Sequence, residues 1–549
     1  MSKKQSDYDA KHLPWWRHAV IYQVYPRSFK DSNNDGIGDI PGIIEKLDYI
    51  ASFGVDAIWL SPVYLSPNRD YGYDIADYTK INPEYGTMRD MDRLISEAKK
   101  RGIRIIMDLV INHTSDQHKW FQSSRNPNSK YRDYYVWRDP SGYKHGEPLP
   151  PNNWTSIFTG PAWTFDKRSG QFYLHLFTEH QPDLNYRNEN VIQEVENVLR
   201  FWLDKGVAGF RCDVINLLYD ESYDDGEPQI SGTGAEYFVS TSGTHRVLKR
   251  LHDDVLAPYG AYTVGELYQG SLAQAKRFTK GDELDTVFGF DHVKQGMVHG
   301  SMTDRLKNGL TKWQKGLSWN TVFFENHDQR RAVSVYGGKD AIKYHDEVAK
   351  MLAAIEFTLR GTAFVYQGQE IGMTDLKIKF DQSRDMVVGM IYQTLVDKHV
   401  PKWLAQRIAL AQGRDSARTP MHWSSDKYAG FSSHKPWMPV NSNYDHISVE
   451  RQENDNTSVL NFYRRMIALK KSSLALQDGS IKFYADKEPI MAYLRQFGQQ
   501  KILIVANLSG KNVRPLTQLH GRIIANSYEG QTEFDDGILQ PYEAVVMEL

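Results

Sequence analysis

A recurring alternation of short apolar strands and amphipathic helices constrains this chain more than any other feature. Eight segments are rich in β-branched and aromatic residues, and most of them are followed by helical periodicity, as at 42–54, 87–102 and 188–206. The eight predicted strands are 20–26, 57–62, 104–110, 209–214, 262–267, 285–290, 320–326 and 363–368. This order predicts an α/β fold with a parallel (β/α)8 barrel, the TIM barrel. A doubly wound open sheet is the alternative, but no G-x-G-x-x-G turn follows the first strand.

Two connections are too long for simple barrel loops. One separates the third and fourth strands, is rich in Trp, Tyr, Pro and Asn, and predicts a small inserted domain. The other, at about 371–455, follows the eighth strand and contains helical pieces near 384–411. From residue 478 the pattern changes to alternating strands, which predicts an antiparallel β-sandwich. We therefore expect a barrel over 1–113 and 187–477, an inserted domain over 114–186, and a C-terminal β domain over 478–549.

The composition excludes several classes of partner. A formal net charge of −2 over 549 residues gives no support for nucleic-acid binding or for a basic membrane-facing surface. The single cysteine, Cys212, allows no intrachain disulfide, which favours a reducing compartment. The N-terminal segment has no apolar stretch of the signal-peptide kind. We expect a cytoplasmic protein, monomeric or weakly self-associating, without nucleic-acid or membrane partners.

Acidic and basic side chains gather at the carboxyl ends of the predicted strands, where barrel enzymes build their sites. In GFRCDVIN, residues 209–216, Arg211 and Asp213 share one face of the strand. Asp213 is predicted at the mouth of the barrel, with Arg211 one layer below to hold its pKa down. Glu266 ends the apolar segment YTVGEL, where a raised pKa would suit it to donate a proton. Two carboxyls in unlike environments are the chemistry of glycoside cleavage.

The same segments resemble the motifs of the α-amylase superfamily, glycoside hydrolase family 13, in its oligo-1,6-glucosidase and α-glucosidase branch. The motif segments are DLVINH (108–113), QPDLN (181–185), GFRCDVIN (209–216), VGE (264–266) and FFENHD (323–328). The flanking segments WWRHAVIYQVYPRSF, GVDAIWLSPVY, YGYDIADY, QGQEIGM and DSARTPMHW are also similar to those of the branch. The resemblance covers nearly the whole chain.

The resemblance implies a retaining mechanism that needs no cofactor for the chemistry. Asp213 would be the nucleophile, Glu266 the acid and base, and Asp328 the stabiliser of an oxocarbenium-like transition state. Asp70 and Arg418 would hold the 4-hydroxyl of the terminal glucose and close the pocket behind it, which favours exo cleavage. The other implied substrate-binding residues are Tyr73 as a stacking platform, His113, Phe158, Gln181, Arg211, Val214 and His327.

The residue after the predicted nucleophile bears on the choice of linkage. Val214 resembles the branch members that prefer α-1,6 bonds, whereas Ala or Thr there resembles the α-1,4-preferring ones. We expect an α-glucosidase that acts on isomaltose and short isomalto-oligosaccharides. A trehalose-6-phosphate hydrolase, an α-1,4-glucosidase and a sucrose-acting enzyme stay open, because 219–234 and 240–246 depart from the branch pattern. The acidic character of 219–234 argues against a phosphate there.

DSNNDGIGD, residues 31–39, has the oxygen-ligand spacing of a calcium loop. The candidate ligands are Asp31, Asn33, Asp35, the Ile37 carbonyl and Asp39. Gly42 replaces the bidentate Glu of an EF-hand at position 12. Comparable loops of the branch hold a structural Ca²⁺, which we expect here; a metal-free turn rich in Asx residues is the alternative.

Overall fold

Eight parallel strands form one sheet that curls into a nearly closed barrel. The computed structural model describes residues 13–229, 231–293, 302–518, 520–528, 530 and 537–549. The sheet order is β13-β12-β11-β5-β2-β1-β15-β14, which confirms the predicted (β/α)8 architecture. The strands are Val20–Val24 (β1), Ala57–Leu60 (β2), Arg104–Leu109 (β5), Gly209–Cys212 (β11), Tyr262–Gly265 (β12), Thr286–Val287 (β13), Thr321–Val322 (β14) and Thr362–Tyr366 (β15). Residues 1–12 of the predicted barrel unit lie outside the described residues.

The two end strands of this sheet meet through a side chain. Thr321 of β14 donates from Oγ1 to the carbonyl of Val287 in β13 at 3.0 Å. Both strands are two residues long, shorter than their predicted segments.

Helices surround the barrel because each buries one apolar face against the strands. Thr87 begins one of them with a capping box to Asp90, as the sequence pattern favours. The outer helices are Met88–Lys100 (α3), Glu189–Asp204 (α5), Ser242–Leu251 (α7), Leu272–Phe278 (α9), Met302–Gly316 (α10), His345–Thr358 (α12) and Val459–Ser472 (α16). The helix predicted at 42–54 is instead two short helices, Ile40–Glu45 (α1) and Leu47–Ser52 (α2), because Lys46 leaves helical geometry at φ −103° and ψ 7°. In the described residues, no helix has the length and apolarity needed to cross a bilayer.

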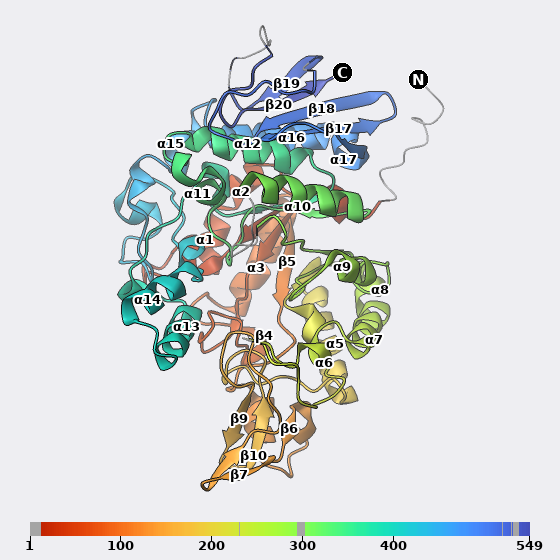
Figure 1. Ribbon diagram of the computed structural model, residues 1–549, viewed down its shortest axis with the longest axis vertical. Coiled ribbons are helices and arrows are strands. Elements are labelled where there is room, and N and C mark those ends of the chain that lie inside the picture. The colour runs from red at the N-terminus through yellow and green to blue at the C-terminus, as the bar shows by residue number, and fades with distance from the viewer. Residues whose placement is uncertain (1–12, 230, 294–301, 519, 529, 531–536) are drawn as a thin grey trace.

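Between β5 and β11 the chain leaves the barrel and forms small sheets of its own. Figure 1 shows this inserted unit (orange) at one end of the molecule and the C-terminal sheet (blue) at the other, with the barrel between them. The elements of the inserted unit are the helix Lys119–Ser124 (α4) and the strands Trp137–Arg138 (β6), Gly142–Lys144 (β7), Glu147–Leu149 (β8), Trp163–Asp166 (β9) and Gln171–Leu174 (β10).

After β15 a helical pair, Met386–Asp397 (α13) and Lys402–Ala411 (α14), occupies the predicted helical region.

The C-terminal unit is a five-stranded antiparallel sheet, as predicted. Its strands, in the order β16-β17-β18-β20-β19, are Ser480–Phe483 (β16), Ile490–Phe497 (β17), Gln500–Asn507 (β18), Arg522–Asn526 (β19) and Ala544–Glu548 (β20). Strand alternation sends Tyr493 and Ile504 into the main core, and Ala492 and Val505 into a separate core on the other face. An isolated bridge between Val513 and Leu539 covers that second face, which is the layered arrangement of a sandwich.

Candidate active site

One buried guanidinium joins three carboxyl groups at the mouth of the barrel. Arg211 is 1% exposed, and its Nη1 donates to Asp108 Oδ1 at 2.8 Å and to Asp213 Oδ1 at 2.6 Å. Its Nη2 donates to a carboxyl oxygen of Glu266. Strand alternation places the Cys212 side chain on the opposite face, where it is buried and where burial raises the pKa of its thiol. The strand thus directs charge to one side and apolar surface to the other.

A pocket of about 280 Å³ opens above this arginine. Its size is near the lower end of the roughly 300–1,000 Å³ typical of ligand pockets, which suits a small sugar unit. It is lined by Asp70, Tyr73, His113, Ile157, Phe158, Phe177, Gln181, Asp213, Val214, Glu266, Tyr268, Asp328, Gln329, Val387 and Arg414. The structure therefore brings the three predicted catalytic acids to one pocket. Three of the predicted binding residues, Arg211, His327 and Arg418, lie behind its lining.

The carboxyls of Asp213 and Glu266 both have raised pKa values. Burial raises the pKa of Glu266 to about 7, Arg211 opposes the rise, and the negative charges of Asp213 and Asp328 add to it. Glu266 therefore keeps a proton near neutral pH, in the direction expected from the sequence. Burial also raises the pKa of Asp213, and Arg211 lowers it by less. The expectation that Arg211 holds the Asp213 pKa below its usual range is therefore wrong in its net sign, because burial outweighs the attraction of a guanidinium that three carboxyls share.

Asp328 is the strongly ionised member of the group. Burial raises its pKa, but His327 in its protonated form, Arg414 and Arg418 together lower it far below the usual range. Arg418 Nη2 donates to Asp328 Oδ1 at 2.6 Å, and Arg418 Nε donates to the carbonyl of His327 at 3.1 Å. A fixed negative charge on Asp328 is suited to stabilising positive charge that develops on a sugar ring.

Asp70 pairs with an arginine that the sequence analysis did not name. Arg414 Nη2 donates to Asp70 Oδ1 at 3.2 Å and to Asp385 Oδ1 at 2.7 Å. Arg418, which the resemblance implies would hold the 4-hydroxyl together with Asp70, is bound to Asp328, and its role toward the sugar stays a prediction. Arg414 directly precedes the short 3-10 segment Asp415–Arg418, and the first arginine contacts Asp70 while the second contacts Asp328.

Two neutral imidazoles lie next to Tyr73; His113 lines the pocket, and His327 lies behind the lining. His327 Nε2 lies 2.6 Å from the hydroxyl of Tyr73, and the two rings stack at 5.6 Å. His113 Nε2 lies 3.0 Å from the carbonyl of Tyr73 and 3.1 Å from Gln181 Nε2. Burial lowers the pKa of His113 to about 4 and that of His327 to about 3. Uncharged imidazoles are suited to hydrogen bonding with sugar hydroxyls.

Four apolar or aromatic members of the lining pack against one hydrophobic cluster, which includes Trp154 of the inserted unit. We call these four residues the leaving-group wall; they are Ile157, Phe158, Val214 and Tyr268. Val214 has φ 35° and ψ 41°, a left-handed conformation that is unusual for a β-branched residue and that turns the chain directly after Asp213.

Sequence reasoning missed several members of this pocket. They are Ile157, Phe177, Tyr268, Gln329, Val387 and Arg414. Arg414 was detectable as a second arginine immediately before the DSARTP segment, and the apolar members carried no signal beyond their hydrophobicity.

The loop at 31–39 is closed by its own hydrogen bonds. Asp31 Oδ1 accepts from the backbone of Asn34 at 2.7 Å, Asp35 Oδ1 accepts from the backbone of Ile37 at 2.8 Å, and Asp39 Oδ1 accepts from the backbone of Gly42 at 2.7 Å. Among the described residues, no three Asp, Glu, His or Cys side chains converge as a metal site. The side chains of the loop offer oxygen atoms, which are the ligands that Ca²⁺ prefers. The structural Ca²⁺ at this loop stays a prediction.

The chain is similar to known proteins over nearly its whole length. Residues 23–479 match the α-amylase family, through the alpha-amylase catalytic domain. The chain is 40% identical to the oligo-1,6-glucosidase of Bacillus cereus, over 97% of this chain and 99% of that protein. It is 39% identical to the trehalose-6-phosphate hydrolase of Bacillus subtilis strain 168, over 98% and 99%. Among solved structures, the isomaltulose synthase of Klebsiella sp. LX3 is similar with a TM-score of 0.91 and 38% identity, covering 98% of this chain and 100% of that one.

Proposed function

The chain belongs to the α-amylase family of glycoside hydrolases, family 13, and from that premise we propose that it is a retaining, exo-acting α-glucosidase. Its proposed substrates are isomaltose and short isomalto-oligosaccharides, from which it releases the non-reducing-end glucose by cleaving an α-1,6 bond. The relatives carry different activities at nearly the same identity, so the choice among them has to come from the pocket.

The observation that carries this choice is the division of the pocket into a closed charged end and an apolar end. At the charged end, Asp70 and Arg414 pair at 3.2 Å, and in our proposal they bind the outer hydroxyls of the terminal glucose and close the pocket behind it. A pocket closed at one end favours cleavage of a terminal unit rather than cleavage inside a chain. At the apolar end, Val214 and the rest of the leaving-group wall would contact the sugar that departs.

A phosphorylated leaving group is less compatible with this pocket. Arg414 is the single Arg or Lys among the described residues that line the pocket, and Asp70, Asp328 and Asp385 already surround it. Arg330, next to the lining residue Gln329, pairs with Asp375 at 2.5 Å. A phosphate needs cationic donors that are free to bind it. The pocket therefore favours the uncharged disaccharide over trehalose 6-phosphate.

In the proposed mechanism, Asp213 attacks the anomeric carbon while Glu266 protonates the departing oxygen. The first step is supported by the pKa of Glu266, which burial and the negative charges of Asp213 and Asp328 raise to about 7. When Asp213 becomes an ester it loses its charge, so the pKa of Glu266 falls. Glu266 then accepts a proton from the attacking water, and the anomeric configuration is retained. Asp328 stabilises the cationic transition state from the closed end.

The test is glucose release from isomaltose, maltose, sucrose and trehalose 6-phosphate at equal concentration. Asp213→Asn serves as the control for contaminating enzymes. We expect isomaltose to be cleaved fastest and early-time NMR to detect α-glucose as the first anomer. If trehalose 6-phosphate or sucrose is cleaved fastest, the substrate proposal is wrong, and if β-glucose forms first, the retaining mechanism is wrong.

A further inference from the structure

The loop that follows β11 is hydrogen-bonded to the inserted unit over many residues. Asn152 Nδ2 donates to the carbonyl of Tyr223 at 3.0 Å, and Trp154 Nε1 donates to the carbonyl of Asp224 at 2.8 Å. Further along, the backbone of Thr155 donates to the carbonyl of Thr233 at 3.3 Å. This loop is the acidic segment that departs from the branch pattern, and it is attached to a unit that lies far from it in the sequence.

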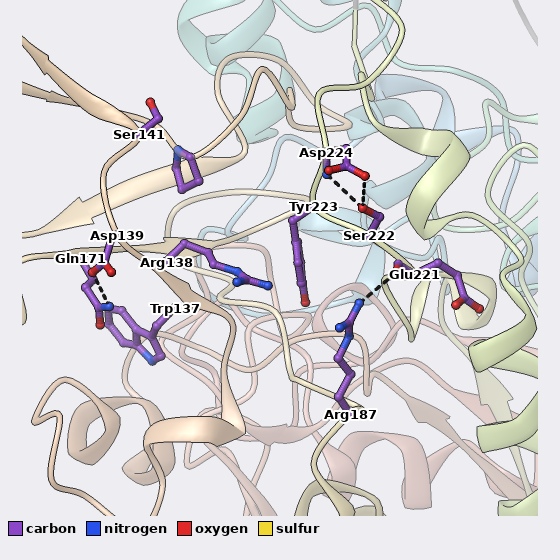
Figure 2. Close-up of a pocket in the computed structure, with 11 residues that line it drawn as sticks. Trp137, Arg138, Asp139, Ser141, Gln171, Arg187, Glu221, Ser222, Tyr223 and Asp224 are labelled. Carbon is purple, nitrogen blue, oxygen red and sulfur yellow. Dashed lines mark hydrogen bonds between the residues drawn. The ribbon is translucent and has the colours of Figure 1, made fainter.

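At the start of this loop, the ring of Tyr223 lies between two arginine side chains. The Cζ atoms of Arg138 and Arg187 lie 4.3 Å and 5.2 Å from the centroid of the Tyr223 ring. Figure 2 shows the ring between the two guanidinium groups. Arg138 belongs to β6 of the inserted unit, whereas Arg187 precedes α5 and donates to the carbonyl of Asp220 at 2.8 Å. We call these three residues the Tyr223 clamp; it connects the loop to both the barrel and the inserted unit.

The far end of the attachment reaches the leaving-group wall. The backbone of Gly232 donates to the carbonyl of Ser156 at 3.2 Å, and Ile157 and Phe158 follow directly. A Cβ atom added to Gly232 would lie 3.1 Å from the hydroxyl of Tyr268, so the loop backbone also packs against that member of the wall. The loop is therefore connected to three of the four residues that define the wall, Ile157, Phe158 and Tyr268.

We propose that the Tyr223 clamp is a specificity-determining positioning element, which holds the leaving-group wall against the departing sugar. This rests on the proposed function in that it assumes glycoside cleavage in the pocket described above. Tyr223 does not line that pocket and acts through the loop, so it is a positioning residue and not a catalytic one. Loss of the clamp loosens the wall and leaves the closed end with Asp70 and Arg414 unchanged.

The experiment compares two substrates in the wild-type protein and in Tyr223→Ala. Isomaltose has a leaving sugar that contacts the wall, whereas α-glucosyl fluoride has a leaving group too small to do so. We expect kcat/KM for isomaltose to fall at least tenfold, mainly through KM, and kcat/KM for α-glucosyl fluoride to stay within twofold. A ratio of the two kcat/KM values within twofold of the wild type would overturn the proposal.

The controls separate local from general damage. Tyr143→Ala removes a tyrosine that is 68% exposed in the same inserted unit, and we expect it to change neither rate. If Tyr223→Ala does not fold, Arg138→Ala tests the same clamp with a smaller expected loss, about threefold, on isomaltose alone. An equal loss on both substrates would indicate general damage and overturn the proposal.

The two proposals fail in different ways. A wild-type protein that prefers another disaccharide overturns the α-1,6 assignment. The clamp is then tested with that disaccharide, by comparing the ratio of its kcat/KM to that of α-glucosyl fluoride in the wild type and in Tyr223→Ala. A wild-type protein that releases no fluoride overturns both.

Discussion

Replacement of Arg414 by alanine should destabilise the protein far more than loss of a surface ion pair. Arg414 binds Asp385 through two bonds, Nη2 to Oδ1 at 2.7 Å and Nε to Oδ2 at 3.0 Å, and the Asp385 side chain is 0% exposed. Arg414 is the main cause that lowers the pKa of Asp385 to about 2, against the rise that burial causes. That shift alone corresponds to about 2–3 kcal/mol of stability at neutral pH.

The full cost should be larger, because Asp70 also loses its partner. Removal of one member of a buried ion pair typically costs about 3–5 kcal/mol, which is the loss we expect for Arg414→Ala. The sign of the pH dependence follows from the pKa values. In the wild type the contribution of Asp385 is present above pH 3.8, its unfolded pKa, and is lost as the pH falls toward 2. In the variant both aspartates take up protons more easily, so the difference between the two proteins should shrink from pH 8 to pH 5.

Urea unfolding at pH 8 and pH 5 measures both effects. Arg407→Ala, which removes an exposed arginine of the nearby helix α14, is the matched control and should change stability by less than about 0.5 kcal/mol. The variant Arg414→Ala with Asp385→Asn should recover part of the loss, because it removes one of the unpaired charges. A loss below about 1 kcal/mol for Arg414→Ala, or a loss that is the same at both pH values, would refute the buried-pair interpretation.

Three further predictions follow from the site. The value of kcat/KM for isomaltose should fall above pH about 7, where Glu266 loses the proton that it donates; a flat profile to pH 9 would contradict this role. Val214→Ala should lower the isomaltose-to-maltose ratio of kcat/KM by about tenfold, as one apolar contact allows, and an unchanged ratio would exclude Val214 from linkage choice. Calcium at about 100-fold above its Kd should stabilise the protein by about 2.7 kcal/mol, which EDTA removes in calorimetry. Asp35→Ala should abolish that difference, and a wild-type melting temperature insensitive to EDTA would refute the calcium loop.

The convergence of the catalytic acids was predictable because it depends on topology. Parallel strands in a barrel bring their carboxyl ends to one rim, so Asp213, Glu266 and Asp328 reach a single pocket although they are far apart in the chain. The period of two along β11 was enough to separate Arg211 and Asp213 from Cys212.

What could not be predicted depends on irregular backbone and on burial. The choice between Arg414 and Arg418 as partner of Asp70 is made at a 3-10 turn, where no periodicity assigns a face. The net pKa of Asp213 depends on how many carboxyls share one cation and on how much water reaches them. The left-handed backbone of Val214 carries no sequence signal, since glycine and asparagine are the usual markers of that conformation.

The buried Cys212 gives the protein an internal reporter. It is the only thiol in the chain, it is 2% exposed, and it lies in β11 between the arginine and the aspartate of the site. Burial keeps its thiol protonated, and only the thiolate reacts with alkylating reagents. The labelling rate of the native protein should therefore measure how often β11 separates from the barrel. A substrate analogue that fills the pocket should slow this labelling, and a second cysteine placed on the surface could be labelled with a fluorophore while Cys212 stays unmodified.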